Sequence, residues 1–259
     1  EELQIRKEAA LKVINLSKAT AEQKIIEVNA IEDYYKQLSV EVVKTRESED
    51  EATEKARQEE LISGAQANAE IALGMTLSLL RNIHTAHLDF IRGKEKYGLE
   101  SNLKASLLSE KKIGLLGFGD LAKSLYPMLL PFTKDINVYD PWIAQKNIKK
   151  LGFNPMNLNQ MFKNCEIIYV LAAVTTKNKN LIDKKLLNKM KSNSLLILMS
   201  RAAVVNFKDL IKRVKKGDIF VATDVFPEEP VPKNDPIRKV KNILFSAHRA
   251  GALEEAFFN

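Results

Sequence analysis

The sequence predicts an α/β fold in which a parallel sheet carries helices on both faces, preceded by a long helical N-terminal segment. From about residue 112 onward, short and nearly continuous apolar segments alternate with stretches that have the spacing of amphipathic helices. This pattern is typical of parallel strands that connecting helices bury on both faces. Upstream, residues 1–63 contain neither glycine nor proline and are rich in Glu, Lys, Ala and Gln, which favours helix. We therefore predict a helical segment over residues 1–63 and an α/β domain over residues 64–259.

Length, cysteine content and hydropathy restrict the class of protein. A chain of 259 residues with 45% hydrophobic residues can bury a sizeable core. The single cysteine, Cys165, has no partner for an internal disulfide, and neither a leader-like segment nor a membrane-spanning apolar run is visible. We therefore expect a cytoplasmic protein with no membrane partner.

The formal charge is unevenly distributed along the chain. Of the 40 basic and 33 acidic residues, 10 and 15 fall within residues 1–60, so that segment carries −5 and the remainder +12. A nucleic-acid-binding surface would require Lys and Arg clustered with aromatic residues on one face. The lysines of the basic part are scattered instead, so we expect no nucleic-acid partner.

Apolar residues in the N-terminal segment follow the three–four spacing of a coiled-coil seam. The residues of this seam are Ile14, Ala21, Val28, Ile31, Tyr35, Leu38 and Val42. Fewer than four clean heptads are present, so two interpretations stay open. The helix could join copies of the chain into a homo-oligomer, or it could pack on its own domain. From Thr45 to Glu60 the pattern gives way to charges, which indicates a solvated stretch.

The region after Gly64 begins with a helical run to about residue 93 and continues with strands alternating with helices. A helix over residues 207–217 ends at Gly217, a residue suited to a C-cap. The expected strands cover residues 112–117, 136–140, 166–173, 194–200, 218–225 and 242–248.

A glycine-rich turn follows the first expected strand. Gly117, Gly119 and Ala122 form a G-x-G-x-x-A pattern where a strand runs directly into a helix. The first glycine permits a tight turn, the second lets the backbone approach a diphosphate, and the alanine lets helix and strand pack closely. The exposed N–H groups at the start of the helix would bind the diphosphate. The sequence therefore predicts a Rossmann-type dinucleotide site.

Asp140 indicates which dinucleotide this site would take. It ends the second strand, twenty-one residues after Gly119, where a carboxylate can bond the ribose hydroxyls of the adenosine. Pro141 and Trp142 follow, with no adjacent arginine to accept a 2′-phosphate. We therefore expect NAD rather than NADP. Asp120 would repel a diphosphate unless its side chain points outward, although its backbone N–H could still serve.

Three polar residues at or near expected strand ends are candidates for catalysis on a 2-oxo acid. Such a reduction needs a cation for the carboxylate, an acid for the carbonyl oxygen and a partner for that acid. Arg201 follows one strand, and its planar guanidinium can bind a carboxylate in two places. His248 ends the last strand and could donate the proton, while Glu229 could keep it protonated near neutral pH. Because carboxyl ends of parallel strands form the ligand crevice, these positions suit a site.

The same segments resemble the D-isomer-specific 2-hydroxyacid dehydrogenase family, from about Gly64 to Asn259. The resemblance implies an NAD-dependent enzyme that transfers hydride between NAD(H) and a small 2-hydroxy or 2-oxo acid. The matching segments, in order, are GAQANAEIALGMTLSLLRNI, KKIGLLGFGDLA, VYDPW, VLAAVTTKNKNLI, LLILMSRAAVVNFKDLI, ATDVFPEEPVPKNDPIR and NILFSAHRAG.

The resemblance also implies roles for individual residues. Arg201 would bind the substrate carboxylate, Glu229 would be the catalytic glutamate and His248 the acid–base. The implied cofactor-binding residues are Gly117, Gly119, Asp120, Leu121, Asp140 and Asp224. No metal is expected, because His84 and His87 lack accompanying ligands and are interpreted as packing histidines.

The sequence also departs from the family pattern. Ala202 follows Arg201 where the family has glycine, and Ala172–Val174 replaces a loop that contains proline. The family places a substrate domain before the cofactor domain, and residues 1–63 show no strand–helix alternation to build one. Two functions therefore stay open. One is a dehydrogenase impaired by the absence of that domain, and the other is a truncated or fused NAD-binding module without catalysis, assembled through its N-terminal helix.

Overall fold

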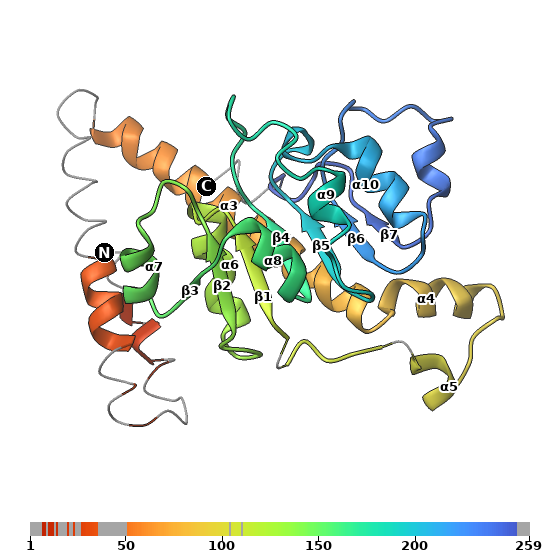
Figure 1. The fold of residues 1–259 in the computed structure, drawn as a ribbon, viewed down its shortest axis with the longest axis horizontal. Coiled ribbons are helices and arrows are strands. Elements are labelled where there is room, and N and C mark those ends of the chain that lie inside the picture. Colours follow the sequence, from red (N-terminus) through yellow and green to blue (C-terminus); the bar gives the residue numbers. More distant parts are fainter. Residues whose placement is uncertain are drawn as a thin grey trace. The chain divides into compact units, whose positions relative to one another are not determined.

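The chain forms two compact units, each built from two stretches of sequence. The first comprises residues 1–60 and 141–155, and the second residues 61–140 and 156–259. The computed structural model (Figure 1) describes residues 7–8, 10–12, 14, 20, 23, 27–35, 51–103, 105–109 and 111–252, with the backbone alone for residues 51–63.

The smaller unit contains helical residues 27–35, the start of α3 (Glu51–Leu80), α7 (Gln145–Lys150) and the two-residue strand β3 (Asn154–Pro155). The helix α7 ends at a glycine in the left-handed conformation, Gly152 with φ +82°. The amide of Gly152 bonds the carbonyl of Lys149 and that of Phe153 the carbonyl of Ile148, which closes a Schellman motif. Of the predicted seam, Val28, Ile31 and Tyr35 lie in the helical stretch, whereas Ala21, Leu38 and Val42 lie outside the described residues.

The helix α3 runs for 30 residues through the predicted boundary at residue 63 without a break. The predicted helical run to residue 93 is interrupted instead at Asn82, which adopts φ 55° before α4 (Ile83–Ile91) begins. Asparagine tolerates this left-handed conformation better than most residues, so the chain can turn there. Ala69, Ala72 and Thr76 are buried on the part of α3 that belongs to the larger unit.

The larger unit is built on six parallel strands, as the alternation of apolar segments predicted. Their order in the sheet is β2-β1-β4-β5-β6-β7, so the direction of winding reverses between β1 and β4. Ligands bind open α/β sheets at such a reversal, outside the carboxyl ends of the strands. The strands are β1 (Ile113–Leu116), β2 (Ile136–Tyr139), β4 (Ile167–Val170), β5 (Leu195–Leu198), β6 (Phe220–Thr223) and β7 (Ile243–Phe245).

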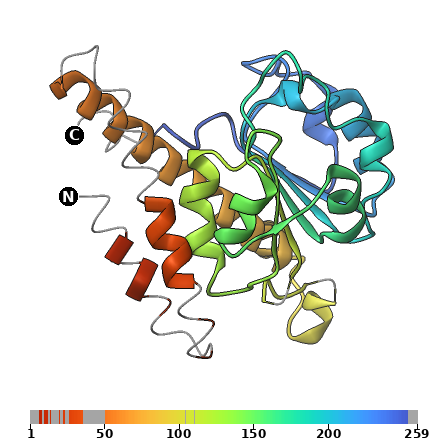
Figure 2. The same cartoon turned by 60° about the vertical axis from the view of Figure 1, so that its left-hand side comes forward.

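Helices cover both faces of this sheet, as predicted. On one face, Ile168 and Val170 of β4 belong to the same apolar core as Phe162, Leu187 and Leu210, which come from three helices of the larger unit. Residues alternate between faces along a strand, so Tyr169 points the other way. Its hydroxyl lies 2.8 Å from Thr76 Oγ1 of α3. In Figure 2, α3 (orange) and the teal and blue helices accordingly lie on opposite sides of the strands.

Three of the connecting helices begin at residues whose side chains cap them. Asn157, Asp183 and Asn206 accept hydrogen bonds from backbone amides three residues later. Such caps satisfy amides that have no partner within the helix. The predicted C-cap residue Gly217 has φ +84°. The helices of the larger unit after β1 are α6 (Asp120–Leu129), α8 (Leu158–Asn164), α9 (Lys184–Leu187) and α10 (Phe207–Val214). Short 3₁₀ turns lie at Ala202–Val204 and Pro236–Lys239, and α5 (Leu99–Asn102) lies upstream of β1.

One arginine is buried between these helices. Arg213 of α10 donates to the carbonyls of Leu187 at 3.2 Å and Met190 at 3.3 Å, and its Nη2 bonds Asp218 Oδ2 at 3.0 Å. The hydrogen bond from Arg213 is the main cause that holds the pKa of Asp218 below its ordinary value. Among the described residues, no helix is long and apolar enough to cross a membrane.

Candidate active site

The glycine-rich turn lies between β1 and α6. Gly117 adopts φ +92°, and a Cβ atom added there would lie 2.6 Å from the Cα atom of Ala172. The turn thus packs against the segment that follows β4. The positive φ of Gly117 and the lack of room for a Cβ atom both require glycine at this position. The Gly117 amide bonds the Tyr139 carbonyl at 2.8 Å.

Open space lies in front of α6. Gly119 is the N-cap of this helix, and a Cβ atom added to it would have no atom within 4 Å. The first amides of a helix have no partner inside it, and its dipole favours an anion at this end. Ala122 is fully buried, which lets α6 pack closely on the sheet. The geometry therefore leaves the amides of residues 119–121 open to a diphosphate, and the binding predicted from the G-x-G-x-x-A pattern stays a prediction.

The structure brings Asp140 to the same turn, although twenty-one residues separate it from Gly119. Asp140 follows β2, the neighbour of β1, and its Oδ2 accepts a hydrogen bond of 2.9 Å from the Phe118 amide. Asp120 differs, because its side chain is 76% exposed and its Oδ1 lies 3.1 Å from Lys123 Nζ. The carboxylate of Asp120 is partly neutralised and its amide stays available, whereas Leu121 is half-buried.

Glu229 and His248 form a pair near the carboxyl ends of β6 and β7. His248 Nδ1 lies 2.5 Å from Glu229 Oε2, and the Phe226 amide donates to Glu229 Oε1 at 2.7 Å. Burial opposes ionisation of Glu229, but the bonds from His248 and Phe226 and the charges of His248 and Arg201 outweigh it and lower the pKa of Glu229. The glutamate is thus a stable carboxylate that orients the imidazole. The side chain of His248 remains 43% exposed, so its other nitrogen can reach a substrate.

Arg201 lies at the same edge of the sheet, three residues after the end of β5. Its guanidinium donates to the Ser200 carbonyl at 2.8 Å, and the residue is exposed. The charge of Arg201 is the smallest of the causes that lower the pKa of Glu229. The structure therefore brings a cation, a carboxylate and a histidine to the edge that also carries the glycine turn.

A scan against family models matches residues 73–250 to the NAD-binding domain of the D-isomer-specific 2-hydroxyacid dehydrogenases. The chain belongs to this family. Among curated proteins, it is 28% identical to D-3-phosphoglycerate dehydrogenase of Methanocaldococcus jannaschii, over 73% of this chain and 36% of that protein. It is 31% identical to glyoxylate reductase of Thermofilum pendens, over 73% of this chain and 57% of that protein. The chain thus spans about a third to three fifths of the length of these relatives.

Two solved structures of dehydrogenases and oxidoreductases share the fold. A phosphoglycerate oxidoreductase from Rhizobium etli superposes with a TM-score of 0.70 at 38% identity, covering 76% of this chain and 63% of that one. The NAD-dependent formate dehydrogenase of Staphylococcus aureus in complex with NAD gives a TM-score of 0.68 at 28% identity, covering 74% and 58%. The family confirms an NAD-binding domain, and the open space before α6 fits that cofactor.

Asp224 contacts the histidine loop of the dehydrogenase domain in a way that sequence analysis missed. It is 1% exposed, and its two carboxylate oxygens accept the amides of Arg249 and Ala250 at 3.1 Å each. Its carbonyl accepts the amide of His248 at 2.7 Å, and His248 has φ 50°. Asp224 thus fixes the backbone that carries His248. Its proposed role near the cofactor stays a prediction.

Asn178 also escaped sequence analysis. It accepts from the Thr175 amide at 2.7 Å and donates to the Ala173 carbonyl at 2.6 Å, which closes the loop after β4. The asparagine-rich stretch KNKN was the available signal, because Asn bonds nearby backbone in turns. This loop abuts Gly117 through Ala172, so it helps to form the space at the glycine turn.

The two histidines of the helical run lie away from these groups in sequence. His84 Nδ1 is 3.3 Å from Ser78 Oγ, and His87 is exposed. In the part of the chain that the structure describes, no three His, Cys, Asp or Glu side chains gather where they could hold a metal ion.

Proposed function

We propose that this chain is the cofactor-binding part of an oxidoreductase that interconverts a small 2-hydroxy acid and the matching 2-oxo acid with NAD. The observation that supports the proposal most directly is the Glu229–His248 pair, placed at the same edge of the sheet as the glycine turn. Family membership supports the reaction type. The activity of the complete enzyme is itself part of this proposal, because the chain spans only part of the length of its relatives.

The proposed residues divide the work on the substrate. The guanidinium of Arg201 binds the substrate carboxylate and places the neighbouring oxygen beside His248. Because Glu229 bonds Nδ1 of His248, Nε2 is the nitrogen that gives a proton to the 2-oxo oxygen or takes it from the 2-hydroxyl. The Glu229 carboxylate stabilises the imidazolium before the proton is given up. Bound NAD supplies the hydride chemistry.

The proposed cofactor residues act mainly through the backbone. The amides of Gly119, Asp120 and Leu121 bind the diphosphate at the N-terminus of α6. The carboxylate of Asp140 bonds the hydroxyls of the adenosine ribose, and the negative charge of Asp140 disfavours a 2′-phosphate. Asp224 stays in the proposed set of cofactor residues on the strength of the family resemblance.

Steady-state NADH oxidation with glyoxylate, hydroxypyruvate and pyruvate tests the proposed reaction. We expect turnover with at least one of these acids, and a loss of about two orders of magnitude or more in kcat for His248→Gln. His84→Gln is the matched control, because it changes a histidine away from the site and should leave kcat unaltered. Saturable NADH binding without turnover would instead favour the NAD-binding module without catalysis.

We further infer that copies of the chain associate. Helix α4 has nine residues and none of them is buried, and a helix this short has little stability without a packing partner. Four of its large apolar side chains, Ile83, Leu88, Phe90 and Ile91, are exposed. Sedimentation of the full chain should show a dimer or larger species that Phe90→Glu dissociates. A monomeric wild type would contradict this inference.

The proposed reaction draws NADH and a small acid from solution, and we place the chain in the cytoplasm on that ground. Fractionation of cells that express the chain, followed by detection with an antibody, tests this placement. Recovery with membranes or outside the cell would contradict it.

A further inference from the structure

A cavity lies at the amino ends of the parallel strands, opposite the carboxyl ends that carry the candidate active site. Its volume is about 540 Å³, which falls within the range of small-molecule sites. Glu166 directly precedes β4, Ser194 directly precedes β5, and Phe220 begins β6, so the cavity opens at the amino ends of these strands. Because all the strands run parallel, the glycine turn and His248 are at the other end. The Rossmann site therefore does not account for this cavity.

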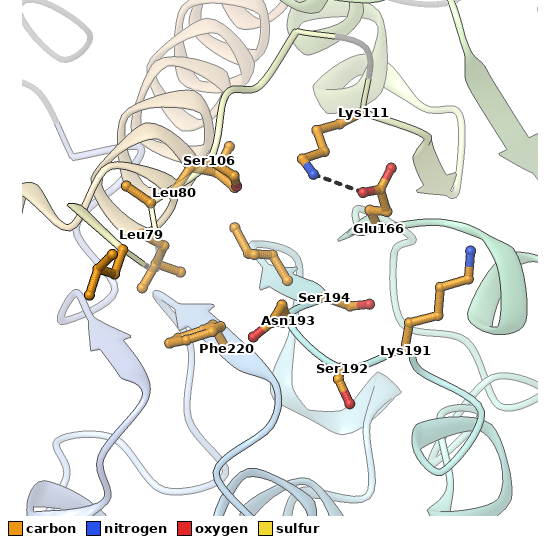
Figure 3. A pocket seen from close by; sticks show the side chains of 13 residues that line it. Leu79, Leu80, Ser106, Lys111, Glu166, Lys191, Ser192, Asn193, Ser194 and Phe220 are labelled. Carbon is orange, nitrogen blue, oxygen red and sulfur yellow. Dashed lines mark hydrogen bonds and ion pairs between the residues drawn. The ribbon is translucent and has the colours of Figure 1, made fainter. Parts of the chain in front are cut away.

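One wall of the cavity is charged (Figure 3). Lys111 Nζ bonds Glu166 Oε1 at 2.8 Å, and the Lys112 amide bonds Glu166 Oε2 at 3.2 Å. Both carboxylate oxygens of Glu166 are therefore occupied. Lys191 Nζ donates to the Asn164 carbonyl at 3.1 Å and forms no ion pair with a described carboxylate. Lys111 and Glu166 neutralise each other, so Lys191 gives this wall a net charge of one positive unit.

A buried hydroxyl without a partner lies on the same side of the cavity. Ser194 is 1% exposed and lines the cavity, yet its Oγ forms no hydrogen bond with any described residue. A buried polar group of this kind destabilises the fold unless something bonds it. In Figure 3, its side chain lies between Asn193 and Lys191, near the charged wall. A ligand oxygen there would satisfy the hydroxyl.

Another part of the lining is apolar, beside the polar residues Ser106, Ser192 and Asn193. Leu79 and Leu80 come from the end of α3, Leu195 from β5 and Phe220 from β6. Figure 3 shows Leu79, Leu80 and Phe220 grouped on one side and the lysines on the other. A ligand that fits both walls has an apolar body and one charged end.

We propose that this cavity binds an amphipathic organic anion, with its acidic group at Lys191 and Ser194 and its apolar body against Leu79, Leu80 and Phe220. The lysine compensates the charge, the serine hydroxyl donates a hydrogen bond, and the leucines and phenylalanine remove the hydrocarbon part from water. Glu166 limits the charge that the wall can accept, which favours a single negative charge over several.

Isothermal titration of the full chain with octanoate tests the proposal, because octanoate has one carboxylate and an apolar chain. We expect saturable binding of one octanoate per chain. Acetate has the charge alone and octanol has the chain alone, and both should bind at least roughly tenfold more weakly. Saturating NADH should leave octanoate binding unchanged. Displacement of octanoate by NADH would place it in the Rossmann site and overturn the proposal.

Two variants identify the polar end of the site. Lys191→Met keeps an unbranched stem and removes the charge, and should weaken octanoate binding about tenfold. Lys189→Met is the matched control, since Lys189 is an exposed lysine two residues away that does not line the cavity. Equal affinities in the two variants would overturn the assignment.

Ser194→Ala is an independent test, because it should change the Tm and the octanoate affinity in opposite directions. Removing an unpartnered buried hydroxyl should raise the Tm of the free protein, while the loss of a donor should weaken octanoate binding. A hydroxyl that served only the fold would lower the Tm and leave the affinity unchanged, which would contradict its proposed role. The absence of saturable octanoate binding to the wild type would overturn the proposal as a whole.

Discussion

Glu229 and His248 are joined by a 2.5 Å contact between Oε2 and Nδ1, although 19 residues separate them in the sequence. The contact leaves Nε2 of the imidazole as the nitrogen available for proton transfer. This contact requires Glu229 to be ionised. The Phe226 amide stabilises the ionised carboxylate by donating a hydrogen bond to its other oxygen, Oε1.

Replacement of this charge tests the pair. Glu229→Gln keeps the size of the side chain but no longer stabilises the imidazolium, so kcat should fall by about two orders of magnitude. Glu228→Gln, at the exposed neighbouring glutamate, is the control and should resemble the wild type. An unchanged kcat in Glu229→Gln would remove the proposed role of the pair.

The two glycines of the turn should respond differently to alanine. At Gly117, positive φ and the 2.6 Å approach to Ala172 make alanine costly, by at least about 1–2 kcal/mol in the free energy of unfolding. At Gly119, φ is −82° and the space is open, so alanine should change stability by no more than about 0.5 kcal/mol. The Cβ atom would nevertheless occupy the space proposed for the diphosphate, and NADH affinity should fall. Thermal unfolding and fluorescence titration separate the two effects, and full NADH affinity in Gly119→Ala would contradict the proposed diphosphate position.

Asp140 should determine the choice between NADH and NADPH. Asp140→Arg removes the carboxylate proposed to bond the ribose and supplies a cation for a 2′-phosphate. We expect weaker NADH binding and a ratio of NADPH to NADH affinity raised by about tenfold or more. Because Asp140 also accepts the Phe118 amide, Asp140→Asn serves as a control that can retain this bond. A ratio that does not change in Asp140→Arg would place the ribose elsewhere.

The buried arginine should be important for stability. Arg213→Met removes the partner of Asp218 and the side-chain donor to the carbonyls of Leu187 and Met190. The Leu187 carbonyl keeps the Met190 amide at 3.3 Å. The Asp218 side chain is 40% exposed and its charge can be solvated, so the expected cost is that of the lost internal hydrogen bonds, about 1–3 kcal/mol in the free energy of unfolding. Lys212→Met on the same helix changes an exposed charge and should cost little. Chemical denaturation measures both, and similar stabilities would show that Arg213 contributes no more than a surface charge.

The Arg213–Asp218 pair also predicts how stability depends on pH. The folded-state pKa of Asp218 lies below its ordinary value, so its contribution is complete above the ordinary aspartate pKa and is lost as pH falls through the lowered value. Stability of the wild type should therefore decrease in acid more than that of Arg213→Met, in which this shift is absent. Denaturation curves from neutral pH to about pH 3 test this, and parallel curves would contradict it.

Local sequence signals predicted the elements of this fold better than the contacts between them. Six strands were predictable because apolar runs such as Ile113–Leu116 have the length and composition of buried strands. The break at Asn82 was not, because the apolar spacing continues across it and only the backbone conformation changes. The Gly117 turn was visible from its spacing alone.

The site was predictable only where side chains form a motif. Asp224 bonds backbone amides, which any residue would provide, so nothing in residues 248–250 identifies it as their partner. The cavity at the amino edge combines Lys111, Glu166 and Ser194, which share no spacing and become neighbours only when β1, β4 and β5 align. Tertiary pairing, not local sequence, creates these features.

The hydrogen bond between Thr76 and Tyr169 has a consequence for how this sequence can change over time. Both groups are fully buried, and burial raises the pKa of the Tyr169 hydroxyl although the Thr76 bond acts in the opposite direction. Thr76 Oγ1 also donates to the Ala72 carbonyl at 2.7 Å, so it keeps a partner if the Tyr169 hydroxyl is lost. Loss of the Thr76 hydroxyl alone would instead leave the buried Tyr169 hydroxyl without this partner. Selection therefore acts on the two positions in one order: descendants of this chain can lose the Tyr169 hydroxyl first, but should lose the Thr76 hydroxyl only together with it or after it.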